Sequence, residues 1–259
     1  RGQQDERVDF NLTGNQVESI ITNWGSVGNG NGSINQAGVW PRGTGHGHIH
    51  EMTGIIVTRT KDAEGNNVTI VSDGYGASSD DTDIDPNTNI RWKYQPLPGY
   101  FNKNAEQPEI ANARNPNSWP STWPDKSSEW DGAWNGYFGL NQFNADQEVF
   151  YVMDDLSNTE YSYYPIDGTT DGGLGLQVRV RLFQWSQALA KDILFMQYEV
   201  SNISDRDYTT RLSELPIIFG GYTDVNPAGS GATDDAAGFD KDYDIVYGWS
   251  STGQGTWTQ

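Results

Sequence analysis

The strongest constraint on this chain is the alternation of apolar and polar residues in the segment "GLQVRVRLFQW" (175–185). Its apolar side chains occupy every second position, namely Leu176, Val178, Val180 and Leu182. Because successive side chains of a β-strand point to opposite faces, this pattern predicts a strand with one buried face. The next segment, "DILFMQYEVSN" (192–202), is apolar on both faces for most of its length, which is typical of a central strand.

Other short runs rich in β-branched and aromatic residues recur along the chain, separated by glycine, proline, asparagine and aspartate. These runs cover residues 54–60, 67–73, 148–154, 215–224 and 243–249. We therefore predict an all-β fold, an antiparallel β-sandwich of the jelly-roll type. We expect residues 1–259 to form a single β-rich unit and, because the last residues read as an interrupted strand, to belong to a longer chain.

Residues 74–147 are different, because they are rich in proline, asparagine, aspartate and tryptophan and show hardly any strand pattern. A loop this long in a compact domain is usually functional or is held in place by its own side chains. We expect a long ordered excursion from the β-rich body.

The charge balance excludes several classes of partner. The chain has 16 basic and 35 acidic residues, a net charge of −19, which argues against binding to nucleic acid or to an anionic membrane surface. No apolar run approaches the roughly 20 residues that span a bilayer, so membrane insertion is not expected. The absence of cysteine excludes disulfides and thiolate metal sites. An excess of carboxylates attracts cations such as calcium, although an acidic surface suited to salty water explains it equally well.

Two acidic segments are candidates for calcium binding, with calcium as the expected cofactor. In "DDTDIDPNTN" (80–89), oxygen-bearing side chains stand at alternate positions, at Asp81, Asp83, Asp85 and Asn87. Pro86 stands where an EF-hand loop needs glycine, which excludes that motif. The second segment (223–244) carries Asp224, Asn226, Asp234, Asp235 and Asp240, whose mutual repulsion a cation would relieve. The alternative for both segments is a polar loop in solvent.

All three histidines of the chain fall within "GTGHGHIHEMTG" (43–54), at His46, His48 and His50. Two histidines in a His-x-His pattern can chelate one transition metal ion. Strand residues four apart are separated by about 13 Å, so His46 and His50 cannot share an ion, and at most His46 and His48 could act with a distant carboxylate. The other interpretation is a strand edge where the imidazoles pack on neighbouring aromatic rings, and the geometry favours it.

The segment "SWPSTWPDKSSEWDGAWNGYFG" (118–139) carries Trp119, Trp123, Trp130 and Trp134. Exposed aromatic rings stack on sugars, which would make this segment a carbohydrate-binding site. Tryptophans interleaved with proline also fasten a loop to the protein body by burying large areas. No nucleophile elbow, phosphate loop or His-Glu-x-x-His motif is present, so the sequence offers no catalytic signature, and we do not expect an enzyme.

Several segments in order along nearly the whole chain carry a resemblance: "QAGVWPRGTGHGHIHEMTG", "YQPLPGY", "SWPSTWPDK", "WNGYFGLNQFNADQEVFYVMDD", "GLGLQVRVRLFQWSQALAKDILFMQYEVSNIS" and "TDDAAGFDKDYDIVYGW". Together they resemble the amino-terminal region of large secreted proteins of Bacteroidetes-like bacteria that are exported with a carboxy-terminal sorting domain. The resemblance implies an extracellular or cell-surface location, a β-rich fold and a longer parent protein. It implies no catalytic residues and no fixed histidines at 46–50.

These observations predict a secreted, non-enzymatic structural or adhesive protein with calcium-stabilised acidic loops. Its expected partners are copies of itself or other surface components. The competing hypothesis is a module that binds or degrades polysaccharide, with glycans held by the tryptophan-rich segment.

Overall fold

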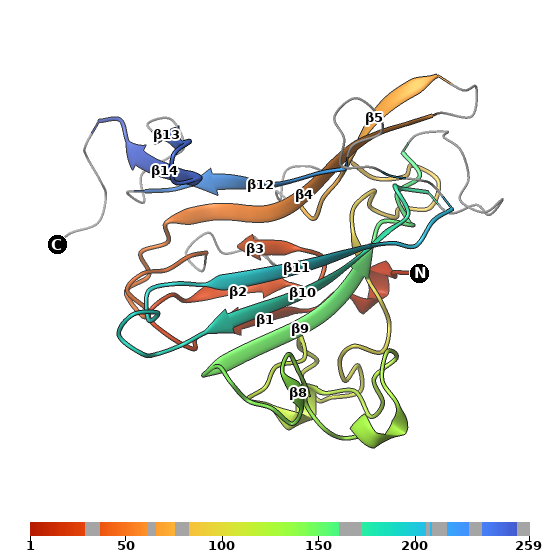
Figure 1. Cartoon of the computed structure of the whole chain (residues 1–259), viewed down its shortest axis with the longest axis horizontal. Coiled ribbons are helices and arrows are strands. Elements are labelled where there is room, and N and C mark those ends of the chain that lie inside the picture. The colour runs from red at the N-terminus through yellow and green to blue at the C-terminus, as the bar shows by residue number, and fades with distance from the viewer. Residues whose placement is uncertain are drawn as a thin grey trace.

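Two antiparallel sheets form the body of the protein (Figure 1). The computed structural model describes residues 1–28, 37–61, 66–75, 83–160, 172–205, 208, 217–227 and 235–252. The larger sheet has the order β1-β2-β3-β4-β12, with β5 also paired to β4, and the smaller has the order β11-β10-β9-β6. The predicted all-β, sandwich-like class is confirmed.

The strands of the larger sheet are β1 (Asp9–Leu12), β2 (Ser19–Thr22), β3 (Ser26–Gly28), β4 (Ile49–Lys61), β5 (Asn67–Ser72) and β12 (Ile218–Val225). Those of the smaller sheet are β6 (Gln95–Pro96), β9 (Gln147–Asp154), β10 (Leu176–Gln184) and β11 (Phe195–Asn202). Two hairpins lie outside the sheets: β7 (Asn135–Gly136) with β8 (Gly139–Leu140), and β13 (Asp235–Asp240) with β14 (Ile245–Ser250). Single helical turns are η1 (Gln4–Glu6), η3 (Pro116–Ser118) and η4 (Ser128–Trp130). None of the helical turns in the described ranges could cross a membrane.

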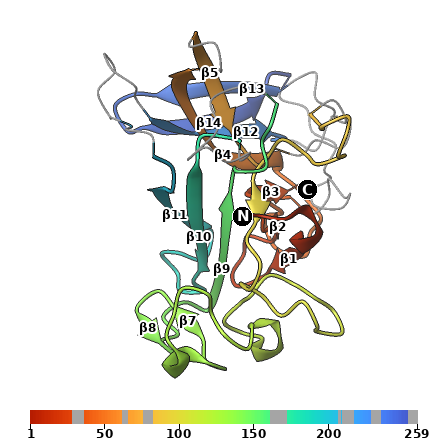
Figure 2. The ribbon, with the colours of Figure 1, turned by 90° about the vertical axis from the view of Figure 1, so that its right-hand side faces the viewer.

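The 13-residue strand β4 organises the larger sheet. Its residues 49–57 pair with β12, its residues 51–53 pair with β3, and its residues 56–61 pair with β5. β12 therefore lies along one edge of β4. β3 and β5 both pair with residues of β4 that β12 also pairs with, so they lie one after the other along the opposite edge. In Figure 2, β5 lies at the top of the view and β7 and β8 lie at the bottom.

The smaller sheet is centred on β9, which is buried at all eight positions. Its side chains divide between two hydrophobic clusters according to the period of two. Val149, Tyr151 and Met153 contribute to the main core between the sheets, whereas Phe150 and Val152 contribute to a second cluster on the opposite face. A strand apolar on both faces needs a layer of protein on each side.

The neighbouring strand β10 shows the predicted alternation. Its apolar residues Leu176, Val178, Val180 and Leu182 belong to the main core. Arg179 and Arg181 point to the outer face, where they are partly exposed. The expectation that residues 192–202 form a central strand is wrong, because among the described residues β11 pairs with β10 alone and ends the sheet. The apolar residues on its outer side, such as Phe195, are accordingly well exposed.

The long segment between β6 and β9 covers the outer face of β9. It contains no strand longer than two residues, and it supplies most of the second cluster: Tyr100, Phe101, Ala111, Trp123 and Trp134. Trp123 and Trp134 meet edge to face at 6.0 Å, and Tyr100 meets Phe150 of β9 at 5.7 Å in the same way. This part of the excursion, residues 97–146, therefore forms a third layer on the sandwich.

A single buried carboxylate connects the two sheets. Asp155 follows β9 directly and is completely buried. Its Oδ2 accepts hydrogen bonds from Ser72 Oγ at 2.6 Å and from the Leu174 amide at 2.7 Å, and its Oδ1 accepts one from the Leu176 amide at 2.9 Å. Ser72 ends β5 of the larger sheet, and Leu176 begins β10 of the smaller. Burial raises the pKa of Asp155, although these hydrogen bonds act against the shift.

We predict that Asp155→Ala lowers the free energy of unfolding by about 3–5 kcal/mol, because a hydroxyl and two amides lose their buried acceptor. Urea denaturation measures this loss. Asp242→Asn is the control, since the Asp242 side chain is 75% exposed and its replacement should change stability by less than about 0.5 kcal/mol. Equal midpoints for the two variants would contradict the connecting role of Asp155.

The preceding residue, Asp154, makes the free energy of unfolding depend on pH. Its carboxylate is buried and accepts hydrogen bonds from the amides of Gly2 at 2.8 Å and Leu156 at 3.2 Å. Burial raises the pKa of Asp154 to about 6. The unfolded chain loses this proton near pH 3.9, so the folded state binds more protons in the window between the two values.

We therefore expect the contribution of Asp154 to stability to be fully present below about pH 4 and to be lost as the pH rises through about 6. Asp154→Asn cannot titrate, so the difference in unfolding free energy between wild type and variant should change by up to about 3 kcal/mol across this window. Urea denaturation of both proteins at several pH values checks this. A difference that stays constant from pH 4 to pH 7 would show that the carboxylate ionises normally.

Candidate functional site

The histidine-rich stretch forms the entry to β4. His46 and His48 precede the strand, whereas His50 lies in it. The stretch runs antiparallel to Val39 and Trp40: the Trp40 amide donates to the His46 carbonyl at 3.1 Å, and His48 Nε2 lies 2.9 Å from the Trp40 carbonyl. The imidazole of His48 packs against the indole of Trp40 at 6.1 Å. This is the contact with a neighbouring aromatic ring that the strand-edge interpretation requires.

The first acidic segment uses its carboxylates within the protein. Asp83 Oδ2 lies 3.0 Å from Nζ of Lys93, whose side chain is only 4% exposed. Asp85 Oδ1 accepts hydrogen bonds from the amides of Asn87 at 2.8 Å and Thr88 at 3.4 Å, and the first of these lowers the pKa of Asp85. Of these carboxylates, Asp83 thus forms an ion pair and Asp85 stabilises a turn. Asp81 lies outside the described residues.

The second acidic segment is spread along two strands. Asp224 and Asn226 lie at the end of β12, whereas Asp235 and Asp240 lie at opposite ends of β13. Asp235 and Asp240 are five steps apart along the strand, a distance of about 17 Å, so one ion cannot bind both. Asp240 Oδ1 accepts the amides of Asp242 and Tyr243 in the turn to β14. Asp234 lies outside the described residues.

Within the ranges that the structure describes, no three histidine, aspartate or glutamate side chains gather as a metal site would need. For the pair His46 and His48, this leaves no carboxylate in place as a third ligand among those residues. The calcium and transition-metal assignments stay predictions.

The tryptophans of the excursion fasten it to the body. Trp123 is 2% exposed and Trp134 is fully buried, so these two rings do not form the exposed surface that the alternative of a sugar platform would need. Their indole N–H groups donate to the Ala133 carbonyl and to Glu148, which satisfies them inside the protein. Trp119 and Trp130 are partly buried against the same cluster.

Trp130 also differs from the two buried rings in its surroundings. The ammonium group of Lys126 lies 4.5 Å from the centre of its ring, a cation–π contact at the surface of the excursion. Lys126 already covers one side of the ring that a sugar would use.

A cavity of about 190 Å³ lies where the excursion meets the outer face of β10 and β11. It is lined by Lys126 and Tyr137 from the excursion and by Arg179, Arg181, Gln197 and Glu199 from the strands. Sequence reasoning missed this site, although the polar residues that alternate along 175–185 marked the face of the strand that faces it.

The two arginines of this cavity are held from behind by carboxylates. Arg179 Nη1 donates to Asp125 Oδ2 at 2.5 Å, and Arg181 Nη1 donates to Glu148 Oε1 at 2.6 Å. The guanidinium of Arg181 lies 4.0 Å above the Phe150 ring. Burial lowers the pKa of Arg181, and the pair with Glu148 offsets part of that shift. The arrangement holds two cations at the floor of a small polar cavity.

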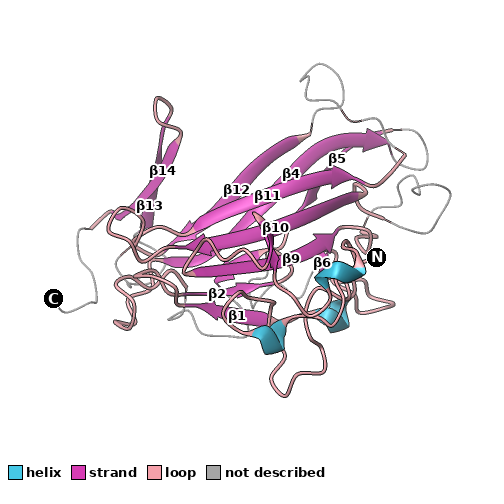
Figure 3. Ribbon diagram, turned by 60° about the horizontal axis from the view of Figure 1, so that its bottom comes forward, coloured by secondary structure: helices cyan, strands magenta, loops and turns pink. Residues whose placement is uncertain are grey.

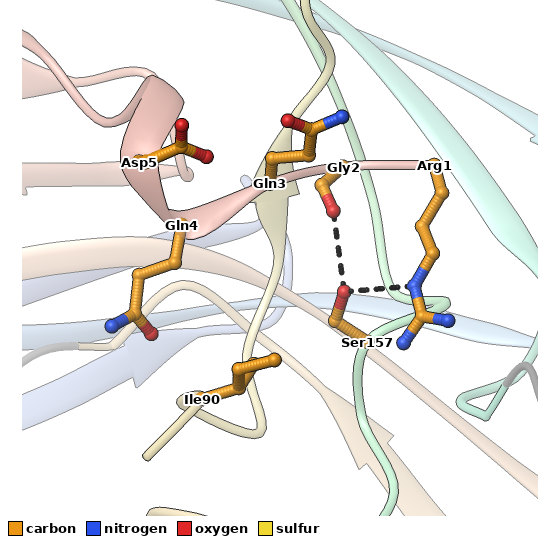
Figure 4. A pocket seen from close by; sticks show the side chains of 7 residues that line it. All are labelled: Arg1, Gly2, Gln3, Gln4, Asp5, Ile90 and Ser157. Atoms are coloured by element: carbon orange, nitrogen blue, oxygen red, sulfur yellow. Dashed lines mark hydrogen bonds between the residues drawn. The ribbon is translucent and has the colours of Figure 1, made fainter. Parts of the chain in front are cut away.

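A larger hollow, of about 630 Å³, lies beside the first residues of the chain (Figure 4). Ser157 Oγ donates to the Gly2 carbonyl at 3.2 Å and accepts from Arg1 Nε at 3.3 Å. Arg1 and Asp5 are the charged residues of its lining, and Figure 4 shows them at opposite ends of it. These contacts attach the first residues to the turn after β9, and they present no acid–base pair.

The hairpin β13–β14 is not paired with either sheet (Figure 3), although Val225 at the end of β12 lies against Gly248 of β14. Its large apolar side chains are between 45% and 75% exposed, and we call this set the apolar ribbon: Phe239, Tyr243, Ile245, Val246, Tyr247 and Trp249. The rings of Tyr247 and Trp249 stack on one face at 5.5 Å. Phe239 and Val246 are paired in register and so share the other face.

Comparisons with known proteins provide no relative to set beside these sites. A scan against protein-family models found no match, and searches of curated proteins and of solved structures found none either. The geometry of the chain itself must carry the functional argument.

We predict that Trp134→Ala lowers the free energy of unfolding by about 3–5 kcal/mol, because it empties the centre of the second cluster. Phe138→Ala is the matched control: this nearby ring is 64% exposed, and its loss should cost less than about 0.5 kcal/mol. Urea denaturation followed by tryptophan fluorescence measures both. A Trp134→Ala protein as stable as the control would contradict the fastening role.

Proposed function

We propose that this protein is a secreted, non-enzymatic structural or adhesive component of the cell surface or extracellular space, which associates with further copies of itself through the apolar ribbon. Calcium assists by neutralising the acidic residues around the ribbon. The observation that carries the proposal is the exposure of six large apolar side chains on one hairpin.

An isolated two-stranded hairpin is marginally stable in water. Within the described residues, β13 and β14 form a sheet of only two strands, so each has an outer edge outside any larger sheet. Unpaired strand edges bind other strands readily, and natural proteins usually protect them with charge or proline. Here the edge of β14 carries the sequence "IVYGWS" (245–250), which contains neither.

The faces of the hairpin support association with an identical surface. Tyr247 lies across Gly238 of the facing strand, where an added Cβ would come within 2.7 Å of its ring. Together with the stacked Trp249 it makes a flat aromatic surface. A two-fold axis can place this surface and the β14 edge of one copy against the same features of another.

The charge of the protein opposes this association, since each copy carries a net charge of −19. Asp240 ends β13, and Asp242 and Asp244 lie in the turn that leads to β14. Repulsion between these turns falls when a divalent cation binds or screens them. Association should therefore be stronger with calcium than with a chelator.

Sedimentation velocity over a range of protein concentrations tests the proposal. We expect wild type to form dimers or larger assemblies more strongly in millimolar calcium than in chelator. Val246→Lys and Tyr247→Lys place a charge on opposite faces of the hairpin. The variant whose face carries the contact should weaken association at least about tenfold. Comparing the two variants identifies the face that carries the contact.

Leu189→Lys is the matched control, because Leu189 is 93% exposed and lies between β10 and β11, outside the ribbon. It should associate like wild type. A wild type that stays monomeric in calcium, or ribbon variants that associate as strongly as Leu189→Lys, would overturn the proposal.

A further inference from the structure

The cavity between the excursion and strands β10 and β11 is separate from the apolar ribbon and has a chemistry of its own. It measures about 190 Å³, below the roughly 300–1,000 Å³ of sites for drug-sized ligands, so it has room for about one small ring. Its floor is formed by residues of β10 and β11 with Phe150 of β9, and its wall by Lys126, Gly136 and Tyr137 of the excursion.

Positive charge is concentrated at this cavity. Lys126, Arg179 and Arg181 are three of the 16 basic residues in a chain that has 35 acidic ones. The three cations line the cavity together with one carboxylate, Glu199, whereas Asp125 and Glu148, the carboxylates that hold the arginines, lie outside the lining. This arrangement favours a ligand with an anionic group.

Arg179 has further N–H donors that can bind a ligand. Its guanidinium makes one hydrogen bond to the residues that the structure describes, from Nη1 to Asp125, while the side chain is 28% exposed. Arg181 is more occupied, since it also donates to the carbonyl and side-chain oxygens of Asn135. A guanidinium held on one side and open on the other is suited to a carboxylate, which accepts two parallel hydrogen bonds.

The same cavity also presents groups that a bare anion would not need. Gln197 and Glu199 of β11 lie directly opposite Arg181 and Arg179 in the strand register. Glu199 would repel a simple anion, but its carboxylate accepts hydrogen bonds from hydroxyl groups, and the amide of Gln197 both donates and accepts. Donors and acceptors side by side fit a ligand with several hydroxyl groups.

An aromatic ring completes the lining. Tyr137 is half exposed, and its ring is held edge to face by Phe138 at 4.9 Å and by Phe183 at 5.9 Å. Its amide donates to Glu148, the carboxylate that also holds Arg181. The position of the ring is thus coupled to that of the guanidinium. A fixed aromatic ring offers an apolar surface to the C–H face of a sugar.

We propose that this cavity binds a single acidic sugar residue, a hexuronate, with its carboxylate at Arg179 and Lys126, its hydroxyls at Gln197 and Glu199, and its ring against Tyr137. The site is distinct from the buried tryptophans and does not depend on association of the ribbon.

Titration of the isotope-labelled protein with D-galacturonate, D-glucuronate, D-galactose and acetate, followed by NMR, tests the proposal. We expect at least one uronate to bind with a Kd in the millimolar range, and both D-galactose and acetate to bind at least about tenfold more weakly. Tyr137→Ala and Glu199→Gln should each weaken uronate binding about tenfold or more. Both side chains are at the surface, so the variants should keep the wild-type spectrum elsewhere.

Leu189→Ala is the control, because this residue is 93% exposed and is not part of the lining; it should keep the wild-type affinity. Arg179→Lys should lose more affinity for the uronate than for D-galactose, since it keeps the charge but not the fork of donors. Acetate binding as tightly as the uronates would show an anion site only and would overturn the sugar assignment. Uronate Kd values above about 50 mM, or equal loss in Leu189→Ala and Tyr137→Ala, would overturn the proposal.

Discussion

The burial of β9 on both faces is the constraint on which the rest of the structure depends. Its odd-numbered apolar residues fill the core between the sheets, and Phe150 and Val152 need a second apolar layer on the outer side. The long excursion provides that layer with its own aromatic rings. Without it, the outer face of a central strand would meet water, and the cavity over β10 and β11 would have no wall.

Buried carboxylates at the two ends of β9 accept hydrogen bonds from the neighbouring layers. Glu148 of β9 accepts from Arg181 and from the Tyr137 amide, and it is buried beneath the excursion. Asp155 performs the corresponding task at the other end of β9, where it joins β5 to β10. Buried carboxylates of this kind are satisfied by fixed donors, and they determine how the layers are placed relative to one another. The acidic residues thus serve structure as well as surface charge.

Three segments show how much of the fold could be predicted from the sequence: β10, the tryptophan-rich segment and β11. The alternation from Leu176 to Leu182 predicted one buried face, and that is how β10 lies. The tryptophan-rich segment left two interpretations open, and the burial of Trp123 and Trp134 supports the fastening role. The position of β11 at the sheet edge was not predictable, because an apolar run reads the same whether or not a second strand pairs with it. The ion pair of Asp83 with Lys93 was not predicted either, because a local sequence pattern does not show which of the charged side chains come together in the folded chain.

The sequence by itself determined the all-β class, the faces of the strands and the acidic character, because these follow from local periodicity and composition. The tertiary structure decided which polar residues meet. Arg179 and Arg181 are marked in the sequence only as the polar side of a strand. The excursion brings Lys126 and Tyr137 to them, and the strand register brings Gln197 and Glu199. Such a cavity depends on contacts between residues far apart in the chain, and these are set by the packing of whole layers.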